Sequence, residues 1–518
     1  MEEVKAKLGT LISEKKRSAR PDNGASWEQA FRSTFDCLDR LGIGNDQVSE
    51  RLRVIHIAGT KGKGSTSAFC ESILRHAGCK KTGLFTSPHL VNINERIRLD
   101  GKSISDEKFC EYFWQVWNRL EETCTPEQGM PAYFRFITLM GYYVFIKEEV
   151  DVAVVEVGLG GRIDSTNVVN RPVVCGIASL GFDHTDLLGD TLAKIAREKA
   201  GIFKKGVPAF TVGQEEEAME SLRDCASERG VEFLKQSGSV GDYCLPEGSD
   251  QVRLGIPGDH QAANAGLAVS LCQTFQERVD LKLSPVVSQG ALTLDCLKGL
   301  ELCRWPGRGQ IEKDNPGDGG AENITFYLDG AHTPESMLCC SKWYQGATKL
   351  ALEASSPSSG ERWLMFNCMR DRDPNVLFEP LQTNHGGDGA TGGAHTMGFD
   401  RSFFVPFVSS TTSLKGDNQS DHKWENGLRG IWDKMLGRAA GGKGSGGREA
   451  LGRSSPDSSG ATGGSSSSSS SSSVCSVQAA LSTLRTYARQ NNTKQIHVLV
   501  TGSLYLVGDF LRILKRVP

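Results

Sequence analysis

The sequence predicts an α/β protein built from two units, the first of which carries a mainly parallel sheet. Short β-branched runs alternate with helical stretches along the first part of the chain. A glycine-rich turn joins one such run to a helix, and the alternation begins again after Trp305-Pro306-Gly307. Alternating strands and helices need crossover connections, and these bury a parallel sheet between helices on both of its faces.

The helices of the first unit are recognised by a repeat of apolar residues close to the helical period. From Ser65 onward, Phe69, Ile73 and Ala77 recur every four residues, and Gly78 is placed to end the helix. Further helices are expected at Tyr133–Lys147 and at 191–200. The expected strands of this unit are 53–58, Thr82–Phe85, 152–157, 173–179 and 207–212.

The second unit repeats the pattern and is interrupted by two tracts of low complexity. Its expected strands are Ile324–Leu328, 362–366, 403–406 and 496–500, with a helix from Leu504. Residues 381–397 are rich in glycine, and residues 436–473 are rich in glycine and serine. Such segments bury too little apolar surface to offset their ordering entropy, so we expect both to be flexible surface insertions.

Composition excludes several classes of protein. Among 518 residues, 59 Lys and Arg face 62 Asp and Glu, a net charge of −3 that lacks the broad cationic surface of a nucleic-acid binder. The best apolar run, 139–146, is far shorter than the ~18 residues that span a bilayer, so we expect a soluble protein. The 15 cysteines contain no Cys-x-x-Cys pair and indicate reduced thiols in a cytoplasmic setting. Glu2, Glu3 and Glu14 argue against a basic transit peptide, although organellar forms are left open.

The clearest motif lies between an expected strand and an expected helix, and it reads Gly59-Thr60-Lys61-Gly62-Lys63-Gly64-Ser65. In a phosphate loop, glycines let backbone N–H groups close on phosphate oxygens, and a lysine, here Lys63, reaches the β- and γ-phosphates. The segment departs from the strict pattern because Ile57 replaces the first glycine and Gly64 replaces the hydroxyl residue that binds Mg²⁺. A metal ion would therefore take its ligands from elsewhere in the chain.

Three polar residues follow expected strands, at the edge where open α/β sheets bind ligands. Ser87 comes just after Thr82–Phe85, Glu156 closes the run 152–157, and His184 follows the run 173–179. A carboxylate at the end of a buried strand is costly unless it is paired or bound to a metal. Taken singly, each residue is explained at least as well by a structural role, as a capping serine, a paired glutamate or a loop histidine. Histidine is also an unusual ligand for Mg²⁺.

Lys199 shares the apolar stripe of the helix expected at 191–200 with Leu192, Ile195 and Ala196. A lysine on an inward face extends its amine toward water, pairs with an acid, or changes its chemistry. The sequence alone favours the first of these. Carbamylation, which would replace the positive charge by a group that accepts hydrogen bonds or binds Mg²⁺, is the alternative.

Three residues of the second unit stand where a nucleotide could be bound between the two units. Asp329 and His332 lie in Asp329-Gly330-Ala331-His332, directly after the strand Ile324–Leu328. Arg308 follows Trp305-Pro306-Gly307 at the expected boundary. Sites formed between domains commonly hold small molecules, so all three are candidate nucleotide contacts.

Taken together, the motifs resemble the folylpolyglutamate synthase family of the Mur ligase superfamily, most of all its eukaryotic members. The resemblance covers about residues 11–517 and weakens only in the two tracts. Its motifs include GTKGKGS (59–65), TSPHLVNINERIRLDG (86–101), MPAYFRFITLM (130–140), EVGLGGRIDSTN (156–167), SLGFDHTDLLGDTL (179–192), GDHQAANAGLA (258–268), WPGRGQ (305–310) and YLDGAHTPESM (327–337).

The resemblance implies a P-loop ATPase-like central domain over 1–304, with a helical lead-in at 1–50, and a smaller Rossmann-like C-terminal domain over 305–518. It makes the loop 59–65 the ATP phosphate loop, and it adds Asn264, Arg308, Asp329 and His332 as ATP contacts. Ser87, Glu156 and His184 would hold Mg²⁺. Lys63, His184 and a carbamylated Lys199 would act in catalysis, a monovalent cation (K⁺) would bind, and the stretch around Phe134 and Phe136 would contact folate.

The implied activity is an ATP-dependent amide ligation that adds L-glutamate to the γ-carboxylate of tetrahydrofolyl-(poly)glutamate through an acyl phosphate. The expected partners are reduced folates, L-glutamate and ATP, with no nucleic acid and no membrane span, and we expect a monomer in the cytoplasm with a mitochondrial form left open. Two alternatives stay open. A dihydrofolate synthase performs the same chemistry on dihydropteroate, and a non-catalytic relative would use the phosphate loop only to bind a nucleotide.

Overall fold

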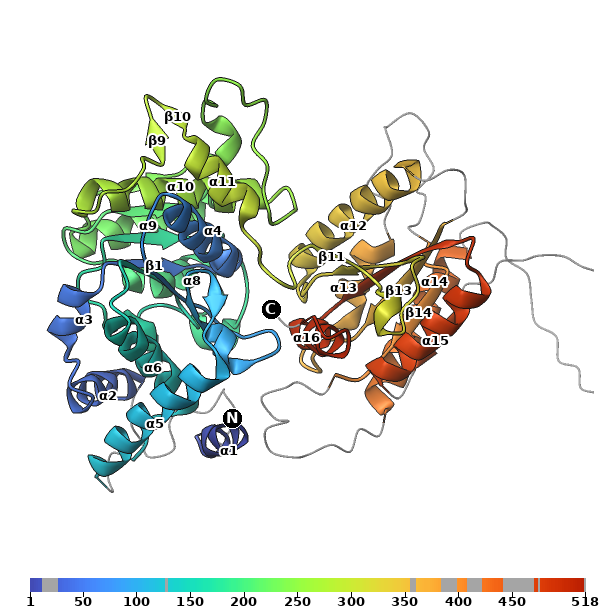
Figure 1. Ribbon diagram of the computed structural model, residues 1–518, viewed down its shortest axis with the longest axis horizontal. Coiled ribbons are helices and arrows are strands. Elements are labelled where there is room, and N and C mark those ends of the chain that lie inside the picture. Colours follow the sequence, from blue (N-terminus) through green and yellow to red (C-terminus); the bar gives the residue numbers. More distant parts are fainter. Residues whose placement is uncertain are drawn as a thin grey trace, which may run out of the picture. The chain divides into compact units, whose positions relative to one another are not determined.

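The computed structural model describes residues 1–11, 27–125, 129–354, 360–382, 398–407, 422–440, 470–473 and 476–516. The chain divides into two compact units, Met1–Pro306 and Gly307–Val517 (Figure 1). The boundary expected from the sequence, between residues 304 and 305, lies two residues before this division.

The first unit contains eleven α-helices and ten strands among its described residues. Its helices are α1 (Glu2–Thr10), α2 (Trp27–Arg40), α3 (Asn45–Arg51), α4 (Lys63–His76), α5 (Asp106–Glu122), α6 (Tyr133–Lys147), α7 (Thr185–Leu188), α8 (Leu192–Lys199), α9 (Glu216–Arg229), α10 (Gln261–Arg278) and α11 (Leu294–Leu302). Its strands are β1 (Val54–Ala58), β2 (Thr82–Phe85), β3 (Ile97–Leu99), β4 (Lys102–Ser103), β5 (Val152–Glu156), β6 (Val174–Ile177), β7 (Ala209–Thr211), β8 (Leu234–Gln236), β9 (Val287–Ser288) and β10 (Ala291–Leu292).

Eight of these strands form one sheet in the order β4-β3-β2-β5-β1-β6-β7-β8. The six strands from β2 to β8 run parallel, and β3 and β4 are added antiparallel at one edge. The expectation of a mainly parallel sheet is therefore confirmed. Because β1 lies in the middle of the sheet, the turn that follows it is flanked by the ends of β5 and β6.

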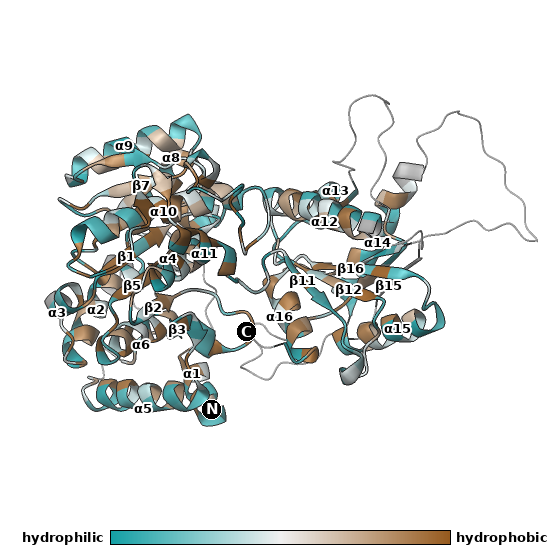
Figure 2. Ribbon diagram, turned by 45° about the horizontal axis from the view of Figure 1, so that its top comes forward, coloured by the Kyte–Doolittle hydropathy of each residue, from teal (hydrophilic) through white to brown (hydrophobic). Residues whose placement is uncertain are grey.

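Helices cover both faces of this sheet, as the crossover connections require (Figure 1). Ile55 and Ile57 of β1 pack with helices α4, α10 and α11, whereas Val54 joins the core under α2, α5 and α6. Hydrophobic residues gather at β1, α4 and α10, while α9 is largely hydrophilic (Figure 2). The two faces of β1 therefore belong to two separate cores, so the strand is fixed from both sides.

The second unit is a smaller α/β structure with one six-stranded sheet of order β11-β12-β16-β13-β14-β15. Only β11 is antiparallel to its neighbour. The strands are β11 (Gln310–Lys313), β12 (Ile324–Leu328), β13 (Gly360–Phe366), β14 (Arg401–Phe404), β15 (Ser470–Ser473) and β16 (Gln495–Thr501). The helices are α12 (Pro334–Ala354), α13 (Pro374–Gln382), α14 (Lys423–Ala440), α15 (Val477–Gln490) and α16 (Leu504–Ile513).

The tract 436–473 departs from its prediction at both ends. Helix α14 continues to Ala440, and Ser470–Ser473 form strand β15, which pairs in parallel with β14 from Arg401↔Ser470 to Phe404↔Ser473. The prediction that the whole tract is a flexible insertion is therefore wrong for these residues, because backbone pairing does not depend on apolar side chains. Residues 441–469 lie outside the described part of the chain. In the other tract, 381–397, the first two residues complete α13, and residues 383–397 lie outside the described part of the chain.

In the described ranges, none of the helices is both long enough and apolar enough to cross a bilayer.

A largely buried carboxylate ties the start of β2 to helices α5 and α6. Glu148, which directly follows α6, accepts hydrogen bonds from the amines of Lys81 (2.5 Å) and Lys108 (2.7 Å) and from the hydroxyl of Tyr112 (2.7 Å). Burial raises the pKa of Glu148, but these three donors outweigh it and lower the pKa from 4.5 to about 2.

We expect Glu148→Gln to lower the free energy of unfolding by about 1–2 kcal/mol at pH 7, with solvent screening of the exposed lysines taken into account. The folded-state pKa is depressed, so the stabilisation is complete above the unfolded value of 4.5 and is lost as the pH falls toward 2. Urea unfolding of both proteins between pH 7 and pH 3 measures the effect. A difference that stays constant over this range would contradict it, and Glu122→Gln at the end of α5 is the control.

Candidate active site

The carboxyl end of β1 brings three chain segments to one edge of the parallel sheet. The register places Ile57 of β1 beside Glu156 of β5, and Ala58 beside Ile177 of β6. The chain leaves β1 at Gly59 and enters α4 at Lys63. The expected phosphate loop thus lies between a fully buried strand and the N-terminus of a helix, although α4 starts two residues before the predicted Ser65.

Two glycines let this loop pack closely against its neighbours. Gly59 has a φ of +151° and Gly62 has a φ of +81°. A Cβ atom on Gly62 would lie 2.2 Å from Oδ1 of Asn264, and one on Gly59 would lie 2.9 Å from Cβ of Ala178. The positive φ of Gly62 turns the chain into α4, and the absence of a side chain there admits Asn264, which is buried on α10.

The loop is also held by the segment that follows β6. The backbone N–H groups of Thr60 and Lys61 both donate to the carbonyl oxygen of Ser179, at 2.8 and 3.0 Å. The hydroxyl of Thr60 donates to the carbonyl of Gly181 at 3.1 Å. The amine of Lys61 forms an ion pair with Asp183 at 3.0 Å. Backbone and side-chain contacts together fix the loop relative to the segment that carries His184.

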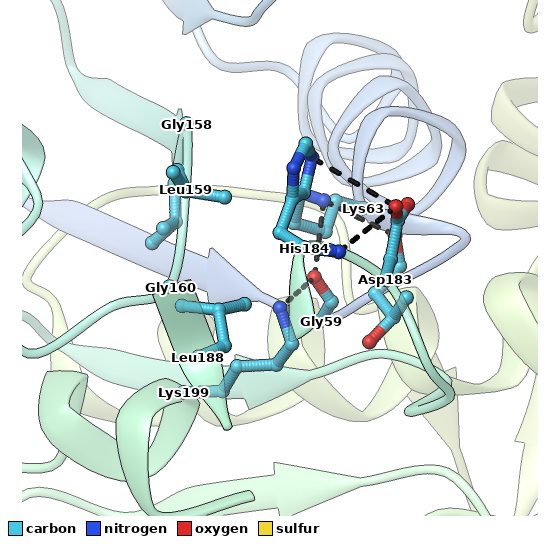
Figure 3. A pocket seen from close by; sticks show the side chains of 11 residues that line it. Gly59, Lys63, Gly158, Leu159, Gly160, Asp183, His184, Leu188 and Lys199 are labelled. Atoms are coloured by element: carbon cyan, nitrogen blue, oxygen red, sulfur yellow. Dashed lines mark hydrogen bonds and ion pairs between the residues drawn. The ribbon is translucent and has the colours of Figure 1, made fainter. Parts of the chain in front are cut away.

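Two lysine amines meet at one carbonyl oxygen. Lys63 donates to the carbonyl of Gly59 at 3.0 Å, and Lys199 donates to the same oxygen at 2.8 Å (Figure 3). Lys199 is only 4% exposed. Burial holds the pKa of Lys199 well below its ordinary value of 10.5, and Lys63 lowers it further, while Asp183 opposes both. The local environment therefore disfavours the charged form of Lys199. Its low exposure argues against the interpretation that its amine extends into bulk water.

A small cavity of about 50 Å³ opens beside these amines. It is lined by Gly59, Thr60, Lys63, Val157, Gly158, Leu159, Gly160, Asp183, His184, Leu188 and Lys199. His184 adopts a left-handed backbone conformation with a φ of +51°, directly before α7, and its N–H donates to Oδ1 of Asp183 at 3.1 Å. All three of the expected catalytic residues, Lys63, His184 and Lys199, therefore line one cavity (Figure 3).

Ser87 and Glu156 form a second contact at the same edge of the sheet. The N–H of Ser87 donates to Oε2 of Glu156 at 2.9 Å, and Glu156 is 5% exposed at the end of β5. The next residue, Val157, lines the cavity. No three His, Cys, Asp or Glu side chains gather into a metal-binding group within the described residues. Of the three expected Mg²⁺ ligands, Glu156 and His184 are of these residue types, and Ser87 is not.

The candidate residues of the second unit lie together around Gly330. The carboxylate of Asp329 accepts the N–H groups of Gly309 (2.8 Å) and Ala331 (2.9 Å). A Cβ atom on Gly330 would lie 2.7 Å from Nη1 of Arg308. Nδ1 of His332 lies 2.8 Å from the carbonyl oxygen of Gly330. Asp329, Arg308 and His332 are thus neighbours within their unit, and their contacts with a nucleotide stay predictions.

Comparison with known proteins places the chain in a family, although no family model matches it. A folylpolyglutamate synthase from Arabidopsis thaliana is 40% identical over 542 aligned residues, which cover 99% of this chain and 88% of the relative. A mitochondrial folylpolyglutamate synthase from Homo sapiens is 42% identical over 74% of this chain and 64% of that relative.

The chain belongs to the folylpolyglutamate synthase family.

The fold agrees with this family membership. The solved structure of a Mycobacterium tuberculosis folylpolyglutamate synthase complexed with ADP superimposes with a TM-score of 0.70 at 21% identity, and the match covers the whole of both chains. At this level of identity the match speaks for the fold alone. The resemblance noted from the sequence motifs is thereby confirmed for both family and fold class.

Sequence reasoning missed Asp183 and misjudged one aromatic residue of this folylpolyglutamate synthase family member. Asp183 pairs with Lys61 and lines the cavity, and its place directly before His184 in a glycine-flanked turn was the available signal. Phe136 is fully buried against Phe113 and Trp117 and is a core residue. Phe134, in contrast, lies against the loop beside the cavity, since a Cβ atom on Gly158 would lie 2.3 Å from its ring.

We expect Lys199→Met to unfold with a free energy about 1 kcal/mol higher than the wild type at pH 7, because it removes a buried amine whose charged form is disfavoured. The pKa is lower in the folded state, so the unfolded chain binds more protons and the wild type gains stability as the pH rises toward 10.5. The advantage of the variant should therefore shrink between pH 7 and pH 10.

Denaturant unfolding at several pH values measures this difference. Lys194→Met, on the same helix with a side chain 62% exposed, is the matched control and should stay within about 0.5 kcal/mol of the wild type. A Lys199→Met variant that is less stable than the wild type at every pH would contradict the expectation.

Proposed function

We propose that the protein is an ATP-dependent ligase that adds L-glutamate to the γ-carboxylate of tetrahydrofolyl-(poly)glutamate, yielding folate polyglutamates, ADP and phosphate. The observation that carries this proposal is the meeting of Lys63, Lys199 and His184 in one cavity at the N-terminus of α4. Family membership supplies the substrate class, and the phosphate-loop geometry supports the use of a nucleoside triphosphate.

The reaction needs two steps, because a carboxylate has no good leaving group. The γ-carboxylate oxygen first attacks the γ-phosphorus of ATP, which releases ADP and forms an acyl phosphate. The amine of the incoming glutamate then attacks the carbonyl carbon, phosphate leaves with the C–O bond electrons, and the amine loses a proton. Lys63 and the N–H groups at the start of α4 would offset charge on the transferred phosphoryl group, and fixed geometry supplies much of the remainder.

The residues present fit a Mg²⁺ ion that accompanies the nucleotide. Glu156 offers a buried carboxylate in direct contact with Ser87, and oxygen ligands are those that Mg²⁺ prefers. Ser87, Glu156 and His184 would hold the ion, which would supply charge neutralisation at the phosphates. Arg308, Asp329 and His332 are proposed as further ATP contacts, and Asn264 as a contact to the adenine.

Lys199 is suited to carbamylation because its surroundings favour the neutral amine, the form that reacts with CO₂. In that step the nitrogen of the neutral amine bonds to the carbon of CO₂ and releases a proton, which leaves a carbamate anion beside Lys63. The anion could accept hydrogen bonds or contact the metal ion, a role that an unmodified ammonium cannot fill.

For the location of the protein, we propose the cytoplasm together with a mitochondrial form.

Incubation with ATP, Mg²⁺, glutamate and tetrahydrofolyl-glutamate, with and without K⁺, should give glutamate-extended products detectable by mass spectrometry. Lys63→Ala should lower kcat/KM by about a thousandfold, because it removes a charge at the developing transition state. Lys298→Ala, an exposed lysine on α11, should leave kcat/KM unchanged.

A parallel reaction with dihydropteroate as acceptor separates the two ligase activities. Ligation to dihydropteroate alone would overturn the proposal in favour of dihydrofolate synthase. Nucleotide binding without ligation to either acceptor would indicate a non-catalytic relative.

A further inference from the structure

A buried histidine on the central strand has one ring nitrogen engaged and the other unpaired. His56 of β1 is 0% exposed, and its Nε2 lies 3.0 Å from the hydroxyl oxygen of Thr166. Nδ1 is buried without a hydrogen-bond partner among the described residues. An unpaired polar atom in the centre of a sheet destabilises the fold, so Nδ1 gives no reason for a histidine at this position. The reason therefore has to be the contact made by Nε2.

The contacts of Thr166 determine where the ring proton resides. Its hydroxyl donates its only hydrogen to Oδ1 of Asp164 at 2.6 Å, so toward His56 the same hydroxyl can only accept. Nε2 of His56 therefore carries the proton and Nδ1 carries none. Burial lowers the pKa of His56 to about 3, which keeps the ring neutral at ordinary pH. The result is a chain of aligned donors that runs from His56 through Thr166 to Asp164.

Asp164 connects this chain of hydrogen bonds to the glycine loop at the cavity. Its Oδ2 accepts the N–H of Leu159 at 2.9 Å, and its own N–H donates to the carbonyl of Gly161 at 3.2 Å. Leu159 and its glycine neighbours Gly158 and Gly160 line the cavity. The carboxylate of Asp164 thus holds the loop 158–161 without lining the cavity itself.

The loop has little room to shift. A Cβ atom on Gly158 would lie 2.3 Å from the Phe134 ring, and one on Gly161 would lie 2.8 Å from the carbonyl oxygens of Glu198 and Lys199. The loop therefore rests on the backbone of the residue whose amine holds Gly59. A displacement of the loop would move the wall of the cavity and the end of α8 together.

From these contacts we infer that His56 is a positioning residue for the ligase reaction. Acting through Thr166 and Asp164, it fixes the glycine loop 158–161 against α8 and so sets the shape of the cavity that holds Lys63, His184 and Lys199. The inference rests on the proposed function for its effect on catalysis, whereas its effect on the loop is independent of that function.

Two substitutions of similar polarity separate the positioning role from a general core role. In His56→Gln the amide nitrogen can reach the place of Nε2 and donate to Thr166. In His56→Asn the amide reaches only the place of Nδ1, where none of the described residues offers a hydrogen-bond partner. We expect kcat/KM for glutamate addition to stay within about threefold of the wild type for H56Q and to fall about tenfold for H56N. Equal losses in both variants, or no loss in H56N, would overturn the inference.

A double-mutant cycle tests the route through Thr166. H56N combined with Thr166→Val should be no less active than Thr166→Val alone, because both changes break the same chain. Tyr344→Phe is the control outside this network. It removes a 2.9 Å hydrogen bond to the carbonyl of His497 in the second unit, so its effect should multiply with that of H56N. Multiplicative losses in the first cycle would contradict the route.

Amide hydrogen exchange of the full chain provides a readout that needs no activity. The Leu159 amide should exchange about tenfold faster in H56N than in H56Q, while amides of α9 stay the same in both. Faster exchange throughout the first unit, or no change at Leu159, would overturn the inference. A wild type that protects Leu159 but does not ligate would instead overturn the proposed function and leave the positioning role intact.

Discussion

The convergence of two lysine amines on the carbonyl oxygen of Gly59 is the interaction on which the candidate site depends. One amine comes from the first turn of α4 and the other from the last turn of α8, so a single backbone atom joins two helices that are far apart in sequence. The geometry is available because β1 is buried in the centre of the sheet and ends at Ala58, directly before Gly59. Burial and charge repulsion disfavour two ammonium groups at this oxygen. Both effects lower the pKa of Lys199, which is the more buried of the two lysines.

The sequence was most informative where a pattern had a local physical cause. The sequence predicts helix α6 with its observed bounds, Tyr133–Lys147, because its long apolar stretch contains no proline and only one glycine, Gly141. The sequence does not predict helix α10. This helix is buried around most of its circumference, so no polar face reveals the helical period of 3.6 residues. Strand β15 was assigned to an insertion because four serines carry no hydrophobic pattern, although their backbone pairs with β14.

The same distinction applies to the candidate site. The loop from Gly59 to Ser65 was recognisable because glycines and a lysine at fixed spacing have a meaning of their own, and Lys199 stood out against its apolar stripe. The role of His56 was not recognisable, and that of Asp183 was indicated only by its place directly before His184. Each residue takes its role from a partner distant in sequence, Lys61 for Asp183 and Thr166 for His56. His56 resembles any polar residue within a β-branched run until the unpaired Nδ1 and the paired Nε2 are seen together.

Strand β15 has a consequence for the behaviour of this protein at high concentration. The outermost strand of an open sheet presents unpaired N–H and C=O groups, which another chain can use to extend the sheet and begin aggregation. In the second unit this position is taken by Ser470–Ser473, next to the aromatic pair Phe403 and Phe404 of β14. A strand of serines completes the hydrogen bonding of β14. Its own outer edge offers a foreign strand almost no apolar surface to bury, so this edge is a poor template for aggregation.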